Sequence, residues 1–113
     1  MVALLAACGT GGLSLTRPTV DVNIVNLSSR DLSNAEVRFG EQVCQWGFVS
    51  RGSTAAYLFY PHPITAQAEL HWVDIGPRMQ PMNLAKIYPR GKSGRLTFTV
   101  HNDRAEATFR EDS

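Results

Sequence analysis

Apolar and polar residues alternate along most of the chain from Val20 onward. A period of two places apolar side chains on one face of a β-strand and polar side chains on the other. The pattern therefore predicts strands that are each buried on one side. The segments that follow it are residues 20–24, 35–39, 44–48, 66–72, 96–101 and 105–110.

Two further features of the pattern predict which side chains are buried. In residues 44–48 the alternation places Cys44, Trp46 and Phe48 on one face, which we expect to point inward. Residues 54–60 are apolar on both faces. That composition is typical of a central strand whose second face is covered, here by a loop.

Turn-forming residues separate these segments at short intervals. No stretch of eleven residues keeps helical spacing without Pro or Gly, so we expect no more than a single helical turn, at residues 84–88. Three residues join segments 95–101 and 105–111, which should form a hairpin. The turn-forming groups are residues 28–34, 40–41, 50–53, 61–63, 74–77, 89–94 and 102–104.

These patterns together predict an all-β fold of seven or eight strands. A single-domain antiparallel β-sandwich, immunoglobulin-like or of a related Greek-key type, is the favoured architecture. A small β-barrel is the alternative, because strand patterns do not determine whether a sheet closes on itself.

The composition is that of a folded single domain whose net charge is too small to create a strong electrostatic field. The chain has 113 residues, of which 43% are hydrophobic and 19% charged, and its net charge is +1. The basic residues are scattered, so we expect no nucleic acid among its partners. No cofactor is implied, and we expect a monomer or a weak homo-oligomer.

The N-terminal residues carry one recognisable motif. Leu5-Ala6-Ala7-Cys8 follows an apolar start and precedes the small residues Gly9-Thr10-Gly11-Gly12. The motif resembles the lipobox of bacterial lipoproteins. The sequence departs from that family in having no Lys or Arg before the motif and only seven residues in front of Cys8.

The resemblance implies a location and a division of the chain. In that family the signal is cut before the Cys, whose thiol carries diacylglycerol, so Cys8 is the expected lipidation site. We therefore expect residues 1–7 to be a truncated remnant of a signal peptide, residues 8–18 a flexible tether and residues 19–111 the β-sandwich domain. Gly9 after the Cys, rather than Asp, favours the outer membrane, with the domain facing the periplasm.

The residues that most often carry chemistry are not gathered in the sequence. His62, His71 and His101 lie 9 and 30 residues apart and lack the short spacing of zinc ligands, so we expect no metal site. Cys44 lies inside an apolar run and is expected to be a core residue. No catalytic constellation stands out, and we expect the protein not to be an enzyme.

One stretch has the features of a recognition loop. In Tyr60-Pro61-His62-Pro63-Ile64 the two prolines restrict the backbone and keep His62 out of a β-ladder. The segment is either a rigid connection between sheets or a pre-organised loop that presents Tyr60 and His62. Tyr88 extends the same surface if the two loops lie at one end of the sandwich.

The sequence therefore favours a membrane-tethered, non-enzymatic binding or scaffolding lipoprotein of the bacterial cell envelope. Its partner would be another envelope protein or a cell-wall component. The alternative is a periplasmic inhibitor of a hydrolase, a lysozyme or a protease, that uses residues 60–64 as its wedge. An enzyme or metal protein and a carrier of apolar ligands are less favoured.

Overall fold

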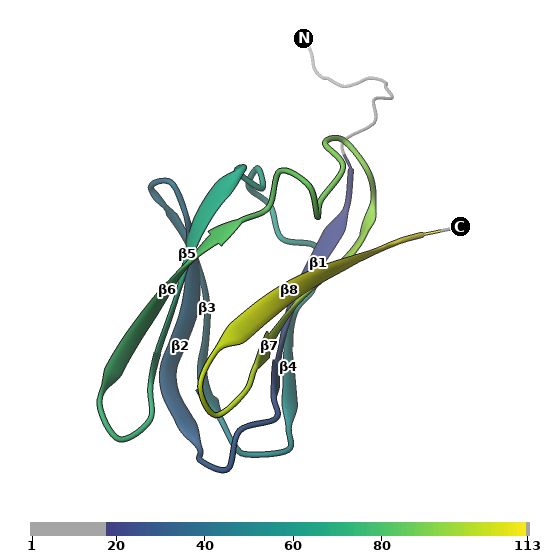
Figure 1. The fold of residues 1–113 in the computed structure, drawn as a ribbon. Coiled ribbons are helices and arrows are strands. Elements are labelled where there is room, and N and C mark those ends of the chain that lie inside the picture. Colours follow the sequence, from purple (N-terminus) through teal and green to yellow (C-terminus); the bar gives the residue numbers. More distant parts are fainter. Residues whose placement is uncertain (1–17, 113) are drawn as a thin grey trace, which may run out of the picture.

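Eight strands form two four-stranded sheets that pack face to face (Figure 1). The computed structural model describes residues 18–112. The predicted all-β sandwich is confirmed, and the sheets do not close into a barrel. The strands are β1 Val20–Asn26, β2 Leu32–Phe39, β3 Gln42–Val49, β4 Thr54–Tyr57, β5 Gln67–Val73, β6 Pro77–Asn83, β7 Gly94–Val100 and β8 Ala105–Glu111.

The strand order combines three hairpins with three pairings of strands that are not consecutive in sequence, β1–β4, β1–β7 and β2–β5. One sheet has the order β4-β1-β7-β8 and the other the order β3-β2-β5-β6. The pairs β2–β3, β5–β6 and β7–β8 are antiparallel neighbours in sequence. β1 lies between β4, which is antiparallel to it, and β7, which is parallel to it. The predicted hairpin of the last two strands is confirmed.

The hydrophobic core lies between the two sheets and is built from the inward positions of the alternating segments. Val22 and Ile24 of β1 face Val37 and Leu70 of the other sheet's strands, and all four side chains are fully buried. Cys44 is buried among them as a free thiol, which confirms that it is a core residue.

A β-bulge makes the prediction for Phe48 wrong. Gln45 and Gly47 pair with consecutive residues of β2, so Trp46 is an extra residue on β3. Gly47 has a φ of 83°, which favours glycine and allows the strand to kink. The extra residue reverses the alternation, so Phe48 is 64% exposed and Val49 is buried in its place.

β4 is a short edge strand, so the prediction of a covered central strand at residues 54–60 is wrong. Only Thr54–Tyr57 pair, and they pair with β1 alone. Tyr57 and Leu58 are exposed at this edge. The doubly apolar pattern that we assigned to burial on two faces belongs instead to an edge whose apolar side chains reach solvent.

β6 is a strand where the sequence predicted only a turn at its first residue. Its residues Pro77 and Pro81 pair with Val73 and Glu69 of β5. Proline lacks the N–H that a second neighbouring strand would need, and edge strands tolerate it for that reason. The two prolines thus leave β6 at the edge of its sheet.

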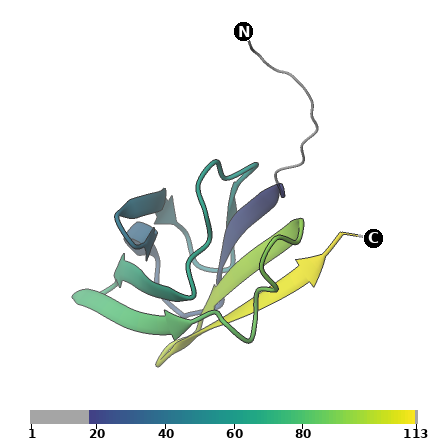
Figure 2. The same cartoon turned by 90° about the horizontal axis from the view of Figure 1, so that it is seen from above.

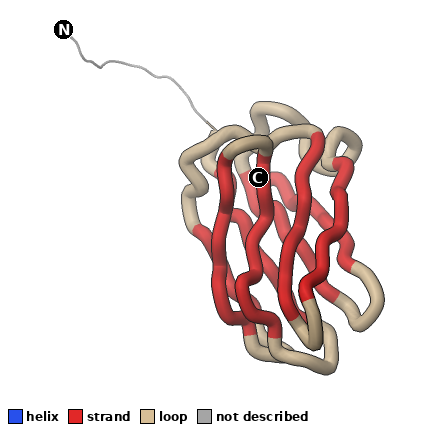
Figure 3. Tube along the Cα trace, turned by 90° about the vertical axis from the view of Figure 1, so that its left-hand side faces the viewer, coloured by secondary structure: helices blue, strands red, loops and turns tan. Residues whose placement is uncertain are grey.

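The connections contain the single helical turn that we predicted. The N–H groups of Ile87 and Tyr88 both donate to the carbonyl of Leu84, at 3.0 and 2.9 Å. The described part of the tube in Figure 3 consists of strands and loops, and this single turn is drawn as loop. Within residues 18–112 no helix has the length and apolar character needed to cross a membrane.

The start of β7 provides a test of the β7–β8 packing. A Cβ on Gly94 would overlap the carbonyl oxygen of Arg110 and lie 2.9 Å from the Cα of Glu111. We expect Gly94→Ala to lower the free energy of unfolding by about 1–3 kcal/mol, the usual cost of overpacking. Gly76→Ala is the control, because no heavy atom lies within 4 Å of the added methyl. Equal chemical denaturation midpoints for the two variants would contradict the close approach.

Candidate functional site

Three segments of the chain meet at the end of the sandwich where the described residues begin. We call this the exit end, formed by residues 18–19, 58–66 and 84–93, and Figure 2 looks onto it. The N–H of Tyr60 donates to the carbonyl of Val20 at 2.8 Å, and the N–H of Gly94 donates to that of Thr19 at 3.1 Å. The first residues of the domain therefore fix both loops in place.

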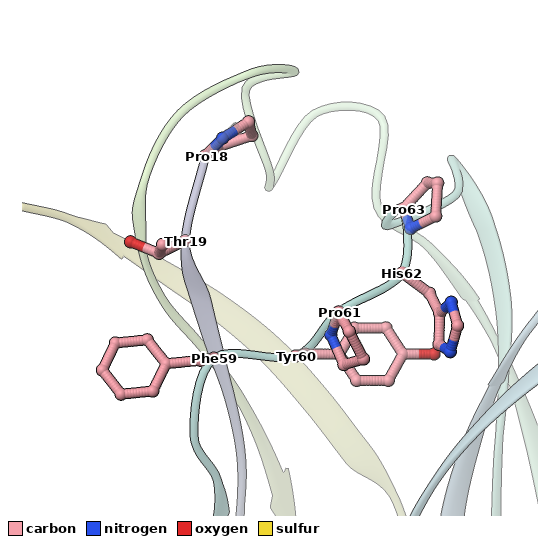
Figure 4. Close-up of a pocket in the computed structure, with 7 residues that line it drawn as sticks. All are labelled: Pro18, Thr19, Phe59, Tyr60, Pro61, His62 and Pro63. Carbon is pink, nitrogen blue, oxygen red and sulfur yellow. The ribbon is translucent and has the colours of Figure 1, made fainter. Parts of the chain in front are cut away.

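The first groove of the exit end lies beside the chain's entry into β1 (Figure 4). It has a volume of about 360 Å³ and we call it the Pro18 groove. Its walls come from the entry segment on one side and the proline-containing loop on the other. The polar side-chain groups of the lining residues are the hydroxyls of Thr19 and Tyr60 and the imidazole of His62. The lining residues are Pro18, Thr19, Phe59, Tyr60, Pro61, His62 and Pro63.

The second groove lies on the other side of the same loop. It has a volume of about 450 Å³ and we call it the Arg90 groove. Pro63 lines both grooves, so the loop is a ridge between them. The structure thereby brings Tyr88 and residues 60–64 to one end of the sandwich. The lining residues are Pro63, Ile64, Thr65, Ala66, Leu84, Ala85, Tyr88 and Arg90.

Tyr60 is not presented to solvent, and this part of the loop prediction is wrong. Its side chain is only 6% exposed, and its ring packs 5.4 Å from Phe39 and 5.5 Å from Tyr57. The hydroxyl is buried without a hydrogen-bond partner. Burial, with smaller contributions from Cys44 and Tyr57, raises the pKa of Tyr60 to about 12. Tyr60 therefore attaches the loop to the core.

The exposed part of the predicted loop is Pro61, His62 and Pro63. Each of the three is exposed, and the His62 ring packs edge-on against Tyr60 with a centroid distance of 5.6 Å. Figure 4 shows His62 beside the hydroxyl end of the Tyr60 ring. Two prolines restrict the backbone on either side of His62, and the imidazole packs against the buried Tyr60 ring, an arrangement that favours a pre-organised contact.

Phe59 is a feature of the site that the sequence analysis missed. Its φ is 54°, and among residues 18–112 the only other positive value outside glycine belongs to Asn34. The N–H of Phe59 donates to Asp21 Oδ1 at 2.9 Å, which holds this strained backbone. The ring points away from Tyr60 into solvent (Figure 4). No sequence signal marks a left-handed phenylalanine, and the apolar run around it was consistent with a strand.

The remaining histidines lie apart from the exit end and from each other. His71 on β5 contacts Glu69 at 3.1 Å, and His101, which follows β7, contacts Glu106 at 2.7 Å. His71 lies in the sheet that contains β5, whereas His101 lies in the turn between β7 and β8 of the other sheet. Among the residues that the structure describes, no group of three or more His, Cys, Asp or Glu side chains is placed to bind a metal ion.

A polar hollow lies at the opposite end of the sandwich, which we call the far end. Ser29, Arg30, Asp31, Arg51 and Asp74 line it. Its carboxylates are already engaged: Asp31 accepts the N–H of Arg51 at 2.9 Å, and Asp74 lies 3.2 Å from the guanidinium of Arg78 outside the hollow. These contacts support the loops of the far end, so we assign the hollow a structural role.

Cys44 is not a candidate nucleophile. Burial raises the pKa of its thiol to about 12, so the thiolate that nucleophilic attack requires is scarce at neutral pH. The exit end instead offers apolar walls, an imidazole and the guanidinium of Arg90. This set of groups can bind an apolar or anionic partner but contains no paired acid and base.

The comparisons with known proteins identify the fold and no family. No protein-family model matches the chain, and no curated protein matches it. A protein from Eubacterium rectale, whose structure was solved by NMR, is similar in fold. Its TM-score is 0.54 at 8% sequence identity, and the alignment covers 90% of this chain and 98% of that one. The protein thus shares a β-sandwich architecture with that structure.

The unpartnered hydroxyl of Tyr60 gives a test of the site's geometry. We expect Tyr60→Phe to leave the free energy of unfolding at pH 7 unchanged or higher, because the substitution removes a buried polar group that has no partner. A loss of more than about 1 kcal/mol in chemical denaturation would contradict the buried, unpaired hydroxyl.

The pH dependence of the same variant follows from the raised pKa. Tyr60 ionises near pH 10 when unfolded and near pH 12 when folded. Its ionisation therefore leaves the unfolding free energy unchanged below pH 10 and lowers it as the pH rises from 10 to 12. The unfolding free energy of the Tyr60→Phe variant should fall less steeply in that range. The wild-type protein, which keeps the Cys44 thiol, is the reference.

Proposed function

We propose that the protein is a lipid-anchored, non-enzymatic binding protein of the bacterial cell envelope and that the exit end is its recognition surface. The observation that carries the proposal is the ridge at Pro63, with a groove on each side of it. Binding surfaces on β-sandwiches are commonly built from loops clustered at one end. The lipobox-like residues Leu5 to Cys8 supply the argument for the anchor.

The rigidity of the ridge supports binding over catalysis. Tyr60 is fixed in the core, and the N–H of Leu84 donates to the carbonyl of Ala66 at 2.7 Å, which joins the two loops. A surface that is already ordered loses little conformational entropy when a partner binds. The partner class that we propose is an envelope protein or a cell-wall component.

The alternative function, inhibition of a hydrolase, would rely on a shorter inserting segment than residues 60–64. With Tyr60 in the core, only Pro61, His62 and Pro63 protrude between the grooves. Three residues are a short insertion for an enzyme's active-site cleft. A lysozyme or protease captured at this ridge would nevertheless favour the inhibitor over a scaffold.

Cys8 provides the test of the anchor. The gene, with its upstream coding sequence, is expressed in a bacterial host, and the membrane fraction is analysed by intact mass. We expect cleavage before Cys8 with added acyl chains, and we expect Cys8→Ser to release the protein from the membrane fraction. An unmodified wild-type protein in the soluble fraction would refute the anchor.

Site-specific photo-crosslinking tests the recognition surface. A photoreactive amino acid replaces His62 at the ridge or, as the control, Met79, which is exposed on β6. In intact cells we expect a discrete crosslinked band from position 62 and none from position 79. Equal patterns from the two positions would remove the argument for the exit end.

A further inference from the structure

The exit end exposes apolar side chains to solvent close to the first residues of the domain. Phe59 is 69% exposed and Leu58 is 59% exposed. Phe59 shares the Pro18 groove with Pro18, where the segment that leads from Cys8 joins the domain. Its ring is kept in solvent by a left-handed backbone that the carboxylate of Asp21 holds in place. Such strain is typical of functional positions.

The two loops of the exit end carry cations and no acidic residue, although Asp21 and Asp112 lie beside them. Residues 84–93 contain Lys86, Arg90 and Lys92 and no acidic residue, and residues 58–66 contain no acidic residue either. Lys92 lies 3.7 Å from Glu111, whereas Lys86 and Arg90 form no ion pair within the described part of the chain. Both are exposed. The exit end therefore combines the exposed apolar side chains of Leu58 and Phe59 with two basic side chains that form no ion pair among the described residues.

We propose that the exit end docks on an anionic phospholipid surface. Leu58 and Phe59 enter the interface between headgroups and acyl chains, and Lys86 and Arg90 contact the lipid phosphates. Apolar side chains bordered by cations are the pattern that favours such surfaces. A second copy of this chain fits less well, because the same cations would repel each other across the interface.

The inference rests on the proposed function and gives it an orientation. Pro18 lies ten residues after Cys8, and ten extended residues span no more than about 35 Å. An acyl anchor at Cys8 therefore keeps the exit end near the bilayer. Docking then restricts the Arg90 groove to partners at the membrane surface and directs the far end away from the bilayer.

Two matched variants test the docking on the full chain carrying Cys8→Ser, so that no acyl group contributes. Phe59→Asn removes the ring, and asparagine adopts a left-handed φ more readily than phenylalanine does. Ile75→Asn is the control, because Ile75 is 73% exposed and lies at the far end next to Asp74. Near-UV circular dichroism confirms that both variants fold.

Co-sedimentation with vesicles measures the partition constant. On vesicles of equal parts phosphatidylglycerol and phosphatidylcholine we expect Phe59→Asn to lower it roughly tenfold and Arg90→Gln to lower it about fivefold. Ile75→Asn should leave it unchanged. On phosphatidylcholine alone we expect much weaker binding by every variant.

Three results would overturn the proposal. They are equal partition constants for Phe59→Asn and Ile75→Asn, no preference for the anionic vesicles, and lipid-independent self-association that Phe59→Asn abolishes. The last result would assign the surface to a second copy of the chain. Intact mass reports on the anchor separately: an unacylated wild type whose Cys8→Ser form still prefers anionic vesicles refutes the anchor and not the docking.

Discussion

The position of β1 is the constraint on which the sheets and the exit end both depend. Its backbone pairs with β4 and β7, and its side chains and carbonyls also reach the opposite sheet. The indole N–H of Trp46 on β3 donates to the carbonyl of Val22 at 3.0 Å, and the fully buried amide of Asn26 donates to the carbonyl of Val49 at 3.1 Å. Thr19 and Val20, where the chain enters this strand, also hold the start of β7 at Gly94 and the loop that contains Tyr60. A displacement of β1 would therefore separate the sheets and disperse the candidate site together.

The opposite side of the sandwich is joined by a side chain and not by a ladder. The amide of Gln80 on β6 donates to the carbonyl of Ala105 on β8 at 2.7 Å and accepts the N–H of the same residue at 2.8 Å. One side-chain amide thus makes the same pair of hydrogen bonds with Ala105 that a residue of a neighbouring strand would make. Because the prolines of β6 cannot extend a ladder, the edge remains closed to further strands and the fold remains a sandwich. The alternation of residues could not distinguish this arrangement from a barrel, since closure depends on edge chemistry.

Features that depend on local sequence could be predicted, and features that depend on distant contacts or on backbone strain could not. The β7–β8 hairpin follows from two alternating segments and a short turn, and the burial of Cys44 follows from its apolar neighbours. Phe48 was placed on the wrong face because a single glycine, Gly47, can reverse the phase of a strand. The parallel pairing of β1 with β7 joins segments that lie far apart in the sequence, as in the pairing of Val20 with Gly94, and no periodic pattern of residues predicts it. For the site, the prolines marked the exposed loop at Pro61–Pro63, but the proline content did not reveal that Tyr60 points into the core.

Adjacent residues of this loop point in opposite directions, so that one attaches the loop to the core while the other is displayed at the exit end (Figure 4). Tyr60 places its ring against Phe39 in the core, while Phe59 directs its ring into solvent from a left-handed backbone. The burial of one ring contributes the stability that offsets the strain and exposure of the other. Because the displayed ring is already fixed, a partner that covers it gains apolar burial without ordering the loop. The same anchoring explains why the unpaired hydroxyl of Tyr60 is tolerated: the ring's packing outweighs one unsatisfied polar group.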